Sequence, residues 1–265
     1  MTQKLTLIKV GGQIVEEPET LQKLLSGFAK IEGHKVLVHG GGRAATRIAS
    51  QLGIESQMVN GRRITDQKML EVVTMVYGGL VNKQIVAGLQ ALNINALGLT
   101  GADLNYMRSA KRPVKEVDYG FVGDVEAVDA TILADLISKG VVPVLAPLTH
   151  DKKGNLLNTN ADTIAAEAAK ALAPYFEVTL VFCFEKRGVL RNPDDDDSLI
   201  PEITETLFKQ YIADGTIQGG MIPKLENSFD AIRAGVKEVI ITKAGAIGEN
   251  AGTVVKTEKA AQLSK

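Results

Sequence analysis

Two lysines that stand beside glycines lie near opposite ends of the 265-residue sequence. Lys9 closes an apolar run and is followed by Gly11-Gly12, and Lys224 follows Gly219-Gly220. Glycines let the backbone approach a ligand closely and present N–H groups to an anion, and a lysine ammonium binds phosphates as a point charge. The two segments indicate two anion sites of the kind that phosphoryl transfer requires, although either lysine alone could be an ordinary surface residue.

A third glycine segment, Gly40-Gly41-Gly42, lies between a strand pattern and a helix pattern. A helix N-terminus behind glycines suits a phosphoryl group or a carboxylate. The segment also fits the loose G-x-G-x-x-A pattern of dinucleotide sites, but Glu55 comes too early and Asp66 begins a helix, so the required acidic residue is missing. The P-loop pattern G-x-x-x-x-G-K-[ST] is not present in the sequence. His39, just before the glycines, is predicted to be packed or hydrogen-bonded rather than a general base.

Two polar segments could bind a carboxylate between these anion sites. Arg63 ends the run Asn60-Gly61-Arg62-Arg63, and the planar fork of arginine suits bidentate capture of a carboxylate. Asn158 can hydrogen-bond a polar ligand. Asp162 opens an alanine-rich helix pattern, where it is either the N-cap or an ionised partner of the two lysines.

Composition narrows the class of protein. Lys and Arg total 30 against 31 Asp and Glu, which argues against a protein that wraps duplex nucleic acid. Cys183 is the sole cysteine, so an intrachain disulfide is impossible, a cytoplasmic location is expected, and the thiol is predicted to be a buried small hydrophobe. We expect neither a signal peptide nor a membrane span. The run of aspartates at 194–197 is predicted to be a solvated loop rather than a metal site, and no metal-ligand cluster is predicted.

Apolar runs of strand length alternate with helical patterns, which predicts a mostly parallel sheet covered on both faces. The predicted strands are residues 5–10, 35–39, 95–99, 141–145, 178–184 and 236–243. The predicted helices are residues 18–31, 43–52, 67–92, 162–173, a part of 201–213, and 223–234, with Pro223 in the first turn of the last.

Other segments break this alternation. Residues 56–65 and 111–128 are predicted hairpins that could cover a site. The polar stretch 148–160 is the predicted boundary between lobes 1–150 and 151–265. The charged tail 256–265 is predicted to fray.

In their order and separation, these segments resemble the amino acid kinase family and, within it, the acetylglutamate kinases of arginine biosynthesis. The resemblance covers nearly the whole chain and includes Gly120-Phe121-Val122-Gly123-Asp124. Aspartate, glutamate 5-, carbamate and uridylate kinases share the lysine-glycine start, but not the pair Asn-x-Asn-Ala-Asp and Gly-Gly-Met-Ile-Pro-Lys. The resemblance implies a three-layer αβα sandwich with a mainly parallel central sheet. It also implies an N-terminal lobe that binds the acylamino acid and dimerises, and a C-terminal lobe that binds ATP.

The resemblance also implies a role for each matching residue. Lys9 and Lys224 would stabilise the transferring phosphoryl group from two sides, with Asp162 orienting both. ATP would enter with Mg²⁺, and no metal would be held by the protein alone. The implied substrate-binding residues are Gly41, Gly42, Arg63 and Asn158, and the implied nucleotide-binding residues are Gly11, Gly12, Glu185, Gly188 and Gly220.

Two departures from the family pattern stand out. Glu185 replaces the aspartate that usually ends the strand beside the nucleotide, within Phe184-Glu185-Lys186-Arg187-Gly188. The extra N-terminal helix of arginine-inhibited relatives has no counterpart, which implies a homodimer without arginine feedback. The expected reaction is ATP-dependent phosphorylation of the side-chain carboxylate of N-acetyl-L-glutamate. The alternatives are the same reaction on N-succinyl-L-glutamate, or a non-catalytic amino-acid sensor, against which the intact Lys9, Asp162 and Lys224 argue.

Overall fold

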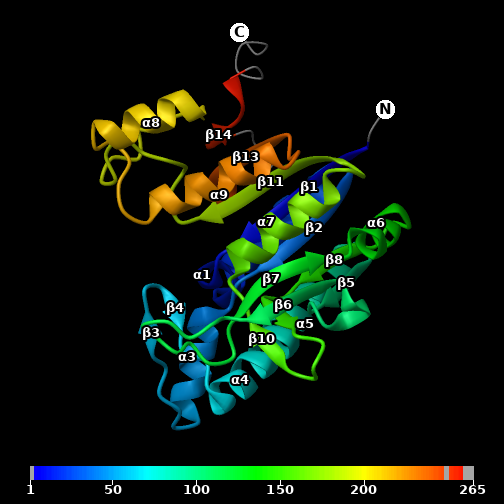
Figure 1. Ribbon diagram of the computed structural model, residues 1–265. Helices are drawn as coiled ribbons and strands as arrows, with labels where there is room; N and C mark the ends of the chain where they lie inside the picture. The colour runs from blue at the N-terminus through cyan, green and yellow to red at the C-terminus, as the bar shows by residue number, and fades with distance from the viewer. Residues whose placement is uncertain (1–2, 248–250, 259–265) are drawn as a thin grey trace.

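A mostly parallel sheet of eight strands runs through the middle of the computed structural model, which describes residues 3–247 and 251–258 (Figure 1). Its strand order is β12-β14-β13-β11-β1-β2-β8-β5, and the one antiparallel pair in this described sheet is β13–β14. The early strands β1 and β2 therefore lie at its centre, beside the late strand β11. The strands are β1 (Lys4–Val10), β2 (His34–His39), β5 (Ala96–Leu99), β8 (Val142–Leu145), β11 (Glu177–Phe184), β12 (Glu202–Ile203), β13 (Glu238–Lys243) and β14 (Thr253–Val255).

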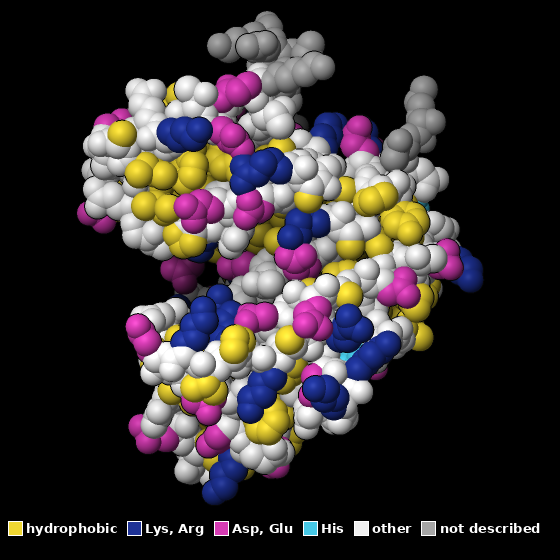
Figure 2. Space-filling view, in the orientation of Figure 1, with side chains coloured by type: hydrophobic (Ala, Val, Ile, Leu, Met, Phe, Trp, Pro, Cys, Tyr) yellow, Lys and Arg dark blue, Asp and Glu magenta, His cyan; other side chains and the backbone are white. Residues whose placement is uncertain are grey.

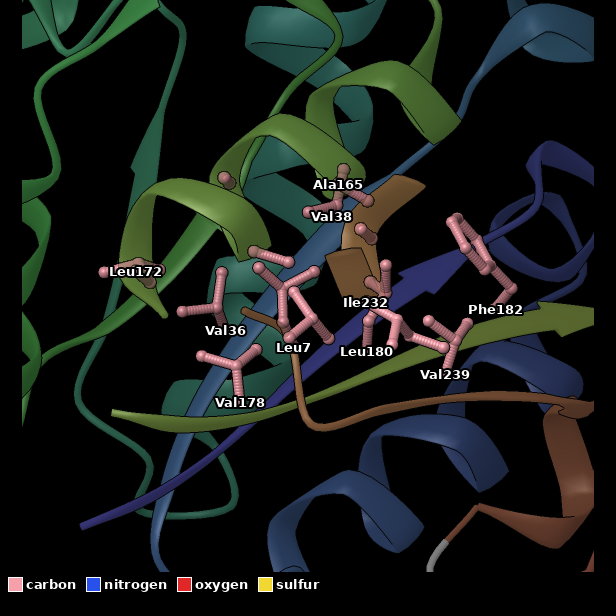
Figure 3. Packing of buried hydrophobic residues seen from close by; sticks show 14 of the residues in the cluster. Leu7, Val36, Val38, Ala165, Leu172, Val178, Leu180, Phe182, Ile232 and Val239 are labelled. Carbon is pink, nitrogen blue, oxygen red and sulfur yellow. The ribbon is translucent and has the colours of Figure 1, made fainter. Parts of the chain in front are cut away.

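Helices cover both faces of this sheet. Side chains alternate along a strand, so Leu5 and Leu7 of β1 join one buried cluster and Ile8 and Val10 join the other. Figure 3 shows the first cluster, where Leu7, Val38 and Leu180 pack against helix residues. The helices of the first cluster are α6 (Ala130–Ser138), α7 (Ala161–Leu172), α8 (Glu205–Ala213) and α9 (Met221–Arg233), and those of the second are α1 (Gly12–Glu16), α2 (Pro18–Lys30), α3 (Gly42–Gln51), α4 (Gln67–Val73), the π-helix η1 (Thr74–Val81) and α5 (Asn82–Gln90).

This arrangement confirms the predicted α/β sandwich with a mainly parallel sheet. Every predicted strand and helix forms, with its ends displaced by at most two residues, and the predicted part of 201–213 is α8. The sequence patterns do not predict α1, α6, β12 or β14. The described chain also contains the short 3-10 helices Asp103–Asn105 and Ala244–Ala246. Of the tail that was predicted to fray, residues 259–265 lie outside the described part of the chain.

A second sheet of four strands, in the order β10-β9-β6-β7, lies beside the first. It contains β6 (Met107–Lys111), β7 (Gly123–Val128), β9 (Leu148–His150) and β10 (Leu156–Asn158). The hairpin predicted at 111–128 is wrong in extent, because its first strand begins before that segment and ends at Lys111. The stretch 148–160 forms the antiparallel β9–β10 pair. The hairpin predicted at 56–65 is confirmed as β3 (Met58–Val59) and β4 (Arg62–Arg63).

The predicted helix at 67–92 is a single 24-residue helix, Gln67–Gln90, with the π-helix η1 in its middle. Its length, and the mean hydropathy of 1.3 of its most apolar 18-residue window, would suffice to cross a membrane. It nevertheless carries Lys68, Glu71 and Lys83, and its Val72 and Ile85 are fully buried against the rest of the protein. We therefore interpret it as a core helix, one face of which stays exposed.

Candidate active site

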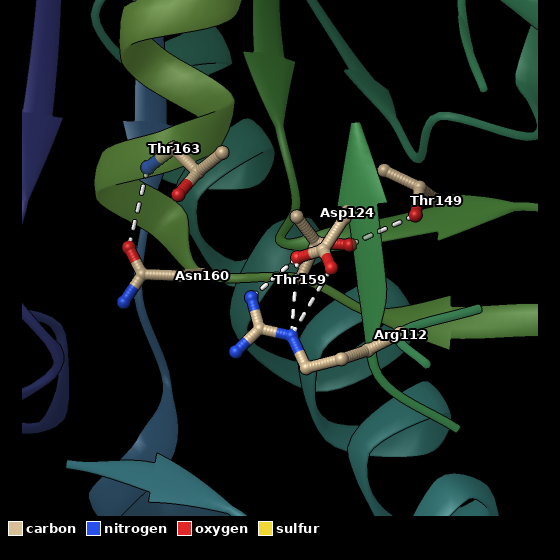
Figure 4. Close-up of polar contacts among 6 residues, drawn as sticks. All are labelled: Arg112, Asp124, Thr149, Thr159, Asn160 and Thr163. Carbon is tan, nitrogen blue, oxygen red and sulfur yellow. Dashed lines mark hydrogen bonds and ion pairs between the residues drawn. The ribbon is translucent and has the colours of Figure 1, made fainter. Parts of the chain in front are cut away.

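Lys9 and Asp162 form an ion pair at the carboxyl end of the central strands. Lys9 points to the α7 side of the sheet, like Leu5 and Leu7, and is only 8% exposed. Its Nζ lies 2.7 Å from Oδ1 of Asp162, which stands in the first turn of α7. The N-cap of α7 is Asn160, whose Oδ1 accepts a hydrogen bond from the backbone N–H of Asp162 and another from that of Thr163. Figure 4 shows the bond between Asn160 and Thr163. Asp162 is therefore not the N-cap, and its carboxylate is available to Lys9.

Lys224 approaches the same place from the first turn of α9. Its Nζ lies 3.8 Å from the centroid of the Phe184 ring, and Nζ of Lys9 lies 5.3 Å from the same centroid. Burial lowers the pKa of Lys224 from its ordinary value, the carboxylate of Asp162 opposes this, and the charge of Lys9 adds to it. Within the described residues, Lys224 has no acidic partner at ion-pair distance. Three of the implied site groups thus come together from three distant segments.

The glycine loops after β1 and β2 pack backbone against backbone. The N–H of Gly40 donates to the carbonyl of Val10 over 2.9 Å. A Cβ atom on Gly40 would lie 3.0 Å from the Gly12 nitrogen, and one on Gly12 would lie 3.3 Å from the Gly42 nitrogen. Side chains at these positions would push the two loops apart, so glycine is required for them to meet. Their amide groups form a cradle at the strand ends where open α/β sheets bind ligands.

His39 supports this cradle from within the core. It is fully buried, its Nδ1 donates to the carbonyl of Gly40 over 2.8 Å, and its Nε2 accepts from Asn82 Nδ2 over 3.1 Å. Asn82 also donates to the carbonyl of Val144. Burial lowers the pKa of His39 to about 4, so the ring is neutral near neutral pH. The predicted hydrogen-bonding role is confirmed. Cys183 is likewise buried as predicted, and burial raises the pKa of its thiol to about 12.

A large cavity of about 730 Å³ lies on one side of the cradle. Residues Gly11, Gly12, Glu185, Gly188 and Lys224 line it, together with apolar side chains such as Ile217 and Met221. Figure 2 shows the protein hollowed on one side, between the half that carries α8 and α9 and the half that carries the β3–β4 hairpin. The cavity accounts for four of the five residues that the resemblance implies for nucleotide binding.

For Gly220 and Gly188, the structure offers a reason for glycine other than nucleotide binding. Gly220 does not line the large cavity and is the N-cap of α9. Gly188 lines it, but a Cβ there would lie 2.6 Å from Leu199 Cδ1 and 2.9 Å from the Thr253 nitrogen. Packing against β14 therefore requires glycine at 188 whether or not a nucleotide binds.

A smaller cavity of about 190 Å³ lies on the other side of the cradle and contains Gly41, Gly42, Arg63 and Asn158. Arg63 is 7% exposed, and its guanidinium donates to the Gly42 carbonyl over 2.8 Å and to Thr46 Oγ1 over 2.9 Å, and also to Ser56 Oγ. All of these acceptors are neutral, and Arg63 has no carboxylate within ion-pair distance in the described chain. A buried cation without an anionic partner is costly, so an acidic ligand would fit here.

Asn158 joins three segments at the smaller cavity. Its Nδ2 donates to Thr65 Oγ1 over 3.0 Å, and its backbone N–H donates to the carbonyl of Phe121. Phe121 in turn donates to the carbonyl of Thr65. The loop between β6 and β7 is thereby fixed to β10 and to the end of the β3–β4 hairpin. The Arg112–Asp124 and Thr149–Thr159 contacts of Figure 4 tie together the neighbouring part of this sheet.

Some residues of the site are missed by sequence reasoning. Tyr77 in η1 lies against Gly41, where a Cβ would come within 2.8 Å of its Cδ1, and no local pattern signals that contact. Arg43 lies 3.5 Å from Glu185, and both line the large cavity. The ring of Phe184 faces both Lys9 and Lys224. The sequence marks Phe184 only as the first residue of the segment 184–188, in which the chain departs from the family pattern.

The model of the amino acid kinase family matches residues 4–243, a span that includes Lys9, Asp162 and Lys224. The chain belongs to the amino acid kinase family. The acetylglutamate kinase of Bacteroides thetaiotaomicron is 75% identical over 256 residues, which cover 97% of this chain and 100% of that relative. The acetylglutamate kinase of Bacteroides fragilis is 72% identical over 97% of this chain and 98% of its own length.

Solved structures show the same fold for this amino acid kinase. The structure of smu.665 from Streptococcus mutans UA159 superimposes with a TM-score of 0.77 at 26% identity, covering 95% of this chain and 98% of that one. The resemblance stated from the sequence motifs is therefore confirmed at the level of the family and of its fold.

Proposed function

We propose that this amino acid kinase transfers the γ-phosphoryl group of ATP to the side-chain carboxylate of N-acetyl-L-glutamate, a step of arginine biosynthesis. The products are ADP and N-acetyl-L-glutamyl 5-phosphate. The observation that carries the proposal is the meeting of two cavities at Gly42. The larger cavity has Lys224 on its wall, and the smaller has the unpaired cation Arg63. The names of relatives that are more than 70% identical over nearly their whole length support the same activity.

The chemistry fits these groups. An oxygen of the acceptor carboxylate bonds to the γ-phosphorus while the bond from that phosphorus to the β,γ-bridging oxygen breaks, and the electron pair leaves with ADP. The acceptor is already ionised near neutral pH, so no general base is needed. His39 is buried and neutral near neutral pH, and the proposal gives it no role as a base. The remaining difficulty is to bring two anions together and to stabilise the charge on the equatorial oxygens.

Fixed positive charge and backbone amides would meet that difficulty. We assign Lys9 and Lys224 to opposite sides of the transferring phosphoryl group. Asp162 would hold Lys9 in place through their ion pair. The amides of Gly11, Gly12, Gly41 and Gly42 would donate to the phosphoryl group and the acceptor. ATP would occupy the larger cavity, near Glu185, Gly188 and Gly220, and Arg63 with Asn158 would hold the α-carboxylate. Mg²⁺ would come with ATP on its phosphate oxygens, and the described residues offer no group of three metal-binding side chains.

One observation favours a second acceptor, N-succinyl-L-glutamate. Arg62 also lines the smaller cavity and has no carboxylate within ion-pair distance in the described ranges. Burial lowers its pKa from the ordinary value, the nearby charge of Arg112 does the same, and the charge of Asp124 opposes both. A succinyl group ends in a carboxylate, which would give Arg62 an anionic partner that an acetyl group does not supply.

The N-terminal lobe, residues 1–150, would carry dimerisation and most of the acceptor binding, to which the C-terminal lobe adds Asn158. The C-terminal lobe, residues 151–265, would carry most of the ATP binding, to which the N-terminal lobe adds Gly11 and Gly12. We propose a cytoplasmic homodimer. The long helix Gln67–Gln90 supports a second copy as the partner, because 44% of its most apolar window is buried and Met75 and Leu80 are 54% and 41% exposed. A molar mass from light scattering that equals one chain would contradict the dimer.

An ADP-release assay tests the function. N-acetylglutamate, N-succinylglutamate, glutamate and aspartate are offered separately with ATP and Mg²⁺. Turnover with an acylated glutamate, and little with the free amino acids, is the expected result. No turnover with either acylated glutamate would contradict the proposal. Turnover restricted to the succinyl substrate would replace the acetyl acceptor by the second candidate. Arg62→Gln should then raise KM for N-succinylglutamate and not KM for ATP.

A further inference from the structure

We propose that Phe184 is a positioning residue for phosphoryl transfer, and that the face of its ring holds the ammonium of Lys224 at the edge of the ATP cavity. This inference rests on the proposed kinase function. Phe184 and Lys224 both line the large cavity, and the Lys224 Nζ lies 3.8 Å from the ring centroid. That distance is well inside the roughly 6 Å within which a cation is attracted to an aromatic face.

The sheet fixes where this ring lies. Strand β11 pairs with β1 in parallel, and Phe182 is the register partner of Lys9. Phe184 stands two residues further along β11, so its side chain is on the same face of the sheet as Phe182, facing α7 and α9. The rings of Phe182 and Phe184 stack with centroids 6.2 Å apart and planes at 19°. Because Phe182 is 5% exposed within the core, it gives the Phe184 ring a rigid support.

The local charges explain why an aromatic ring is useful here. Asp162 pairs with Lys9 at 2.7 Å, and its charge also acts on Lys224 from beyond ion-pair distance. Lys224 has no ion pair of its own among residues 3–247 and 251–258. The negative face of an aromatic ring attracts a cation without neutralising it. A second carboxylate would hold Lys224 equally well, but it would cancel the charge and repel the phosphates of ATP.

The ring therefore pre-positions Lys224 while leaving its full charge for the transferring phosphoryl group. Pre-positioned charge contributes mainly in the transition state, where charge on the phosphoryl oxygens develops. Loss of the ring's electron density should thus lower kcat more than it raises KM for ATP. A role limited to packing would instead depend on the size of the side chain.

Fluorinated phenylalanines separate these two roles, because each fluorine weakens the negative face of the ring with little change of shape. The chain is prepared with 4-fluoro-, 3,5-difluoro- and 3,4,5-trifluorophenylalanine at position 184, and with the same series at position 182 as the matched control. We expect kcat to fall stepwise with fluorine number at position 184, by about 10-fold for the trifluoro ring, with KM for ATP changing by less than about 3-fold. The series at position 182 should be flat.

A kcat that does not change along the series at position 184, or that falls equally at position 182, would overturn the inference. Two natural variants give an independent check: Phe184→Tyr should keep most of the turnover, and Phe184→Leu should lose about 10-fold in kcat. Equal turnover of Phe184→Leu and Phe184→Tyr would also overturn it. The unmodified chain is assayed first with N-acetylglutamate and N-succinylglutamate. Failure of that assay counts against the proposed function, whereas a flat series in an active enzyme counts against Phe184 alone.

Discussion

The ammonium of Lys9 lies 2.7 Å from the carboxylate of Asp162, and this contact links the end of a central strand to the first turn of α7. The Lys9 side chain is 10% exposed and that of Asp162 is 27% exposed. Charges so far from bulk water interact strongly, and removing one partner leaves the other unsatisfied. The pair therefore fixes the Lys9 ammonium where the proposed phosphoryl group must be stabilised.

Asp162→Asn should lower kcat by about 100-fold, because Lys9 loses the charge that holds it. The free energy of unfolding should fall by about 1–3 kcal/mol, since a partly buried lysine is left without its carboxylate. Steady-state ADP release and thermal unfolding measure the two effects.

Asn160→Ala is the matched control for Asp162→Asn. It removes the N-cap of α7, worth about 1 kcal/mol, and leaves the Lys9–Asp162 pair in place. Its kcat should stay within about 3-fold of the unmodified chain. Equal losses of kcat in the two variants would mean that Asp162 matters only for the start of the helix.

Arg63→Lys should raise KM for the acylated glutamate by at least about 10-fold, because lysine keeps the charge but loses the planar fork that fits a carboxylate. KM for ATP should change little, since Arg63 lines the smaller cavity and not the larger one. A parallel rise of both KM values would contradict the division of the two cavities between the two substrates. Circular dichroism checks that the loss of bonds to Gly42 and Thr46 has not unfolded the variant.

Because His39 is buried, the stability of the protein should fall at acidic pH. Its pKa is lowered from 6.5 to about 4, mainly by burial, so the unfolded chain binds more protons between these values. The free energy of unfolding should therefore fall as the pH falls from 6.5 towards 4, by at most about 3 kcal/mol from this residue. His39→Gln should lower stability near neutral pH and flatten this part of the curve. If the two proteins lose stability in parallel over this range, His39 is not the group responsible.

Much of the fold could be predicted because its signals are local. The apolar runs that end at Lys9 and His39 are central strands, and central strands of a parallel sheet are apolar throughout. Pro223 falls in the first turn of α9 as expected. The β3–β4 hairpin follows from Asn60-Gly61, both of which have positive φ.

The rest of the site depends on contacts between distant segments. Asn160 and Asp162 are both good N-cap residues, and only the start of α7 at Ala161 decides between them. The ring of Phe184 meets Lys9 and Lys224 through the β1–β11 register, which no local pattern encodes. The π-helix that places Tyr77 near Gly41 interrupts an apolar pattern that reads as ordinary α-helix.

The two-lysine mechanism is tested most directly by Lys9→Ala and Lys224→Ala in the ADP-release assay, with the dissociation constant of ATP measured by calorimetry. Each variant should lose about 10²–10³ in kcat, because fixed positive charge acts chiefly in the transition state. Each should bind ATP within about 10-fold of the unmodified chain. If either variant kept near-normal kcat, that lysine would not stabilise the transferring phosphoryl group and the mechanism would be wrong.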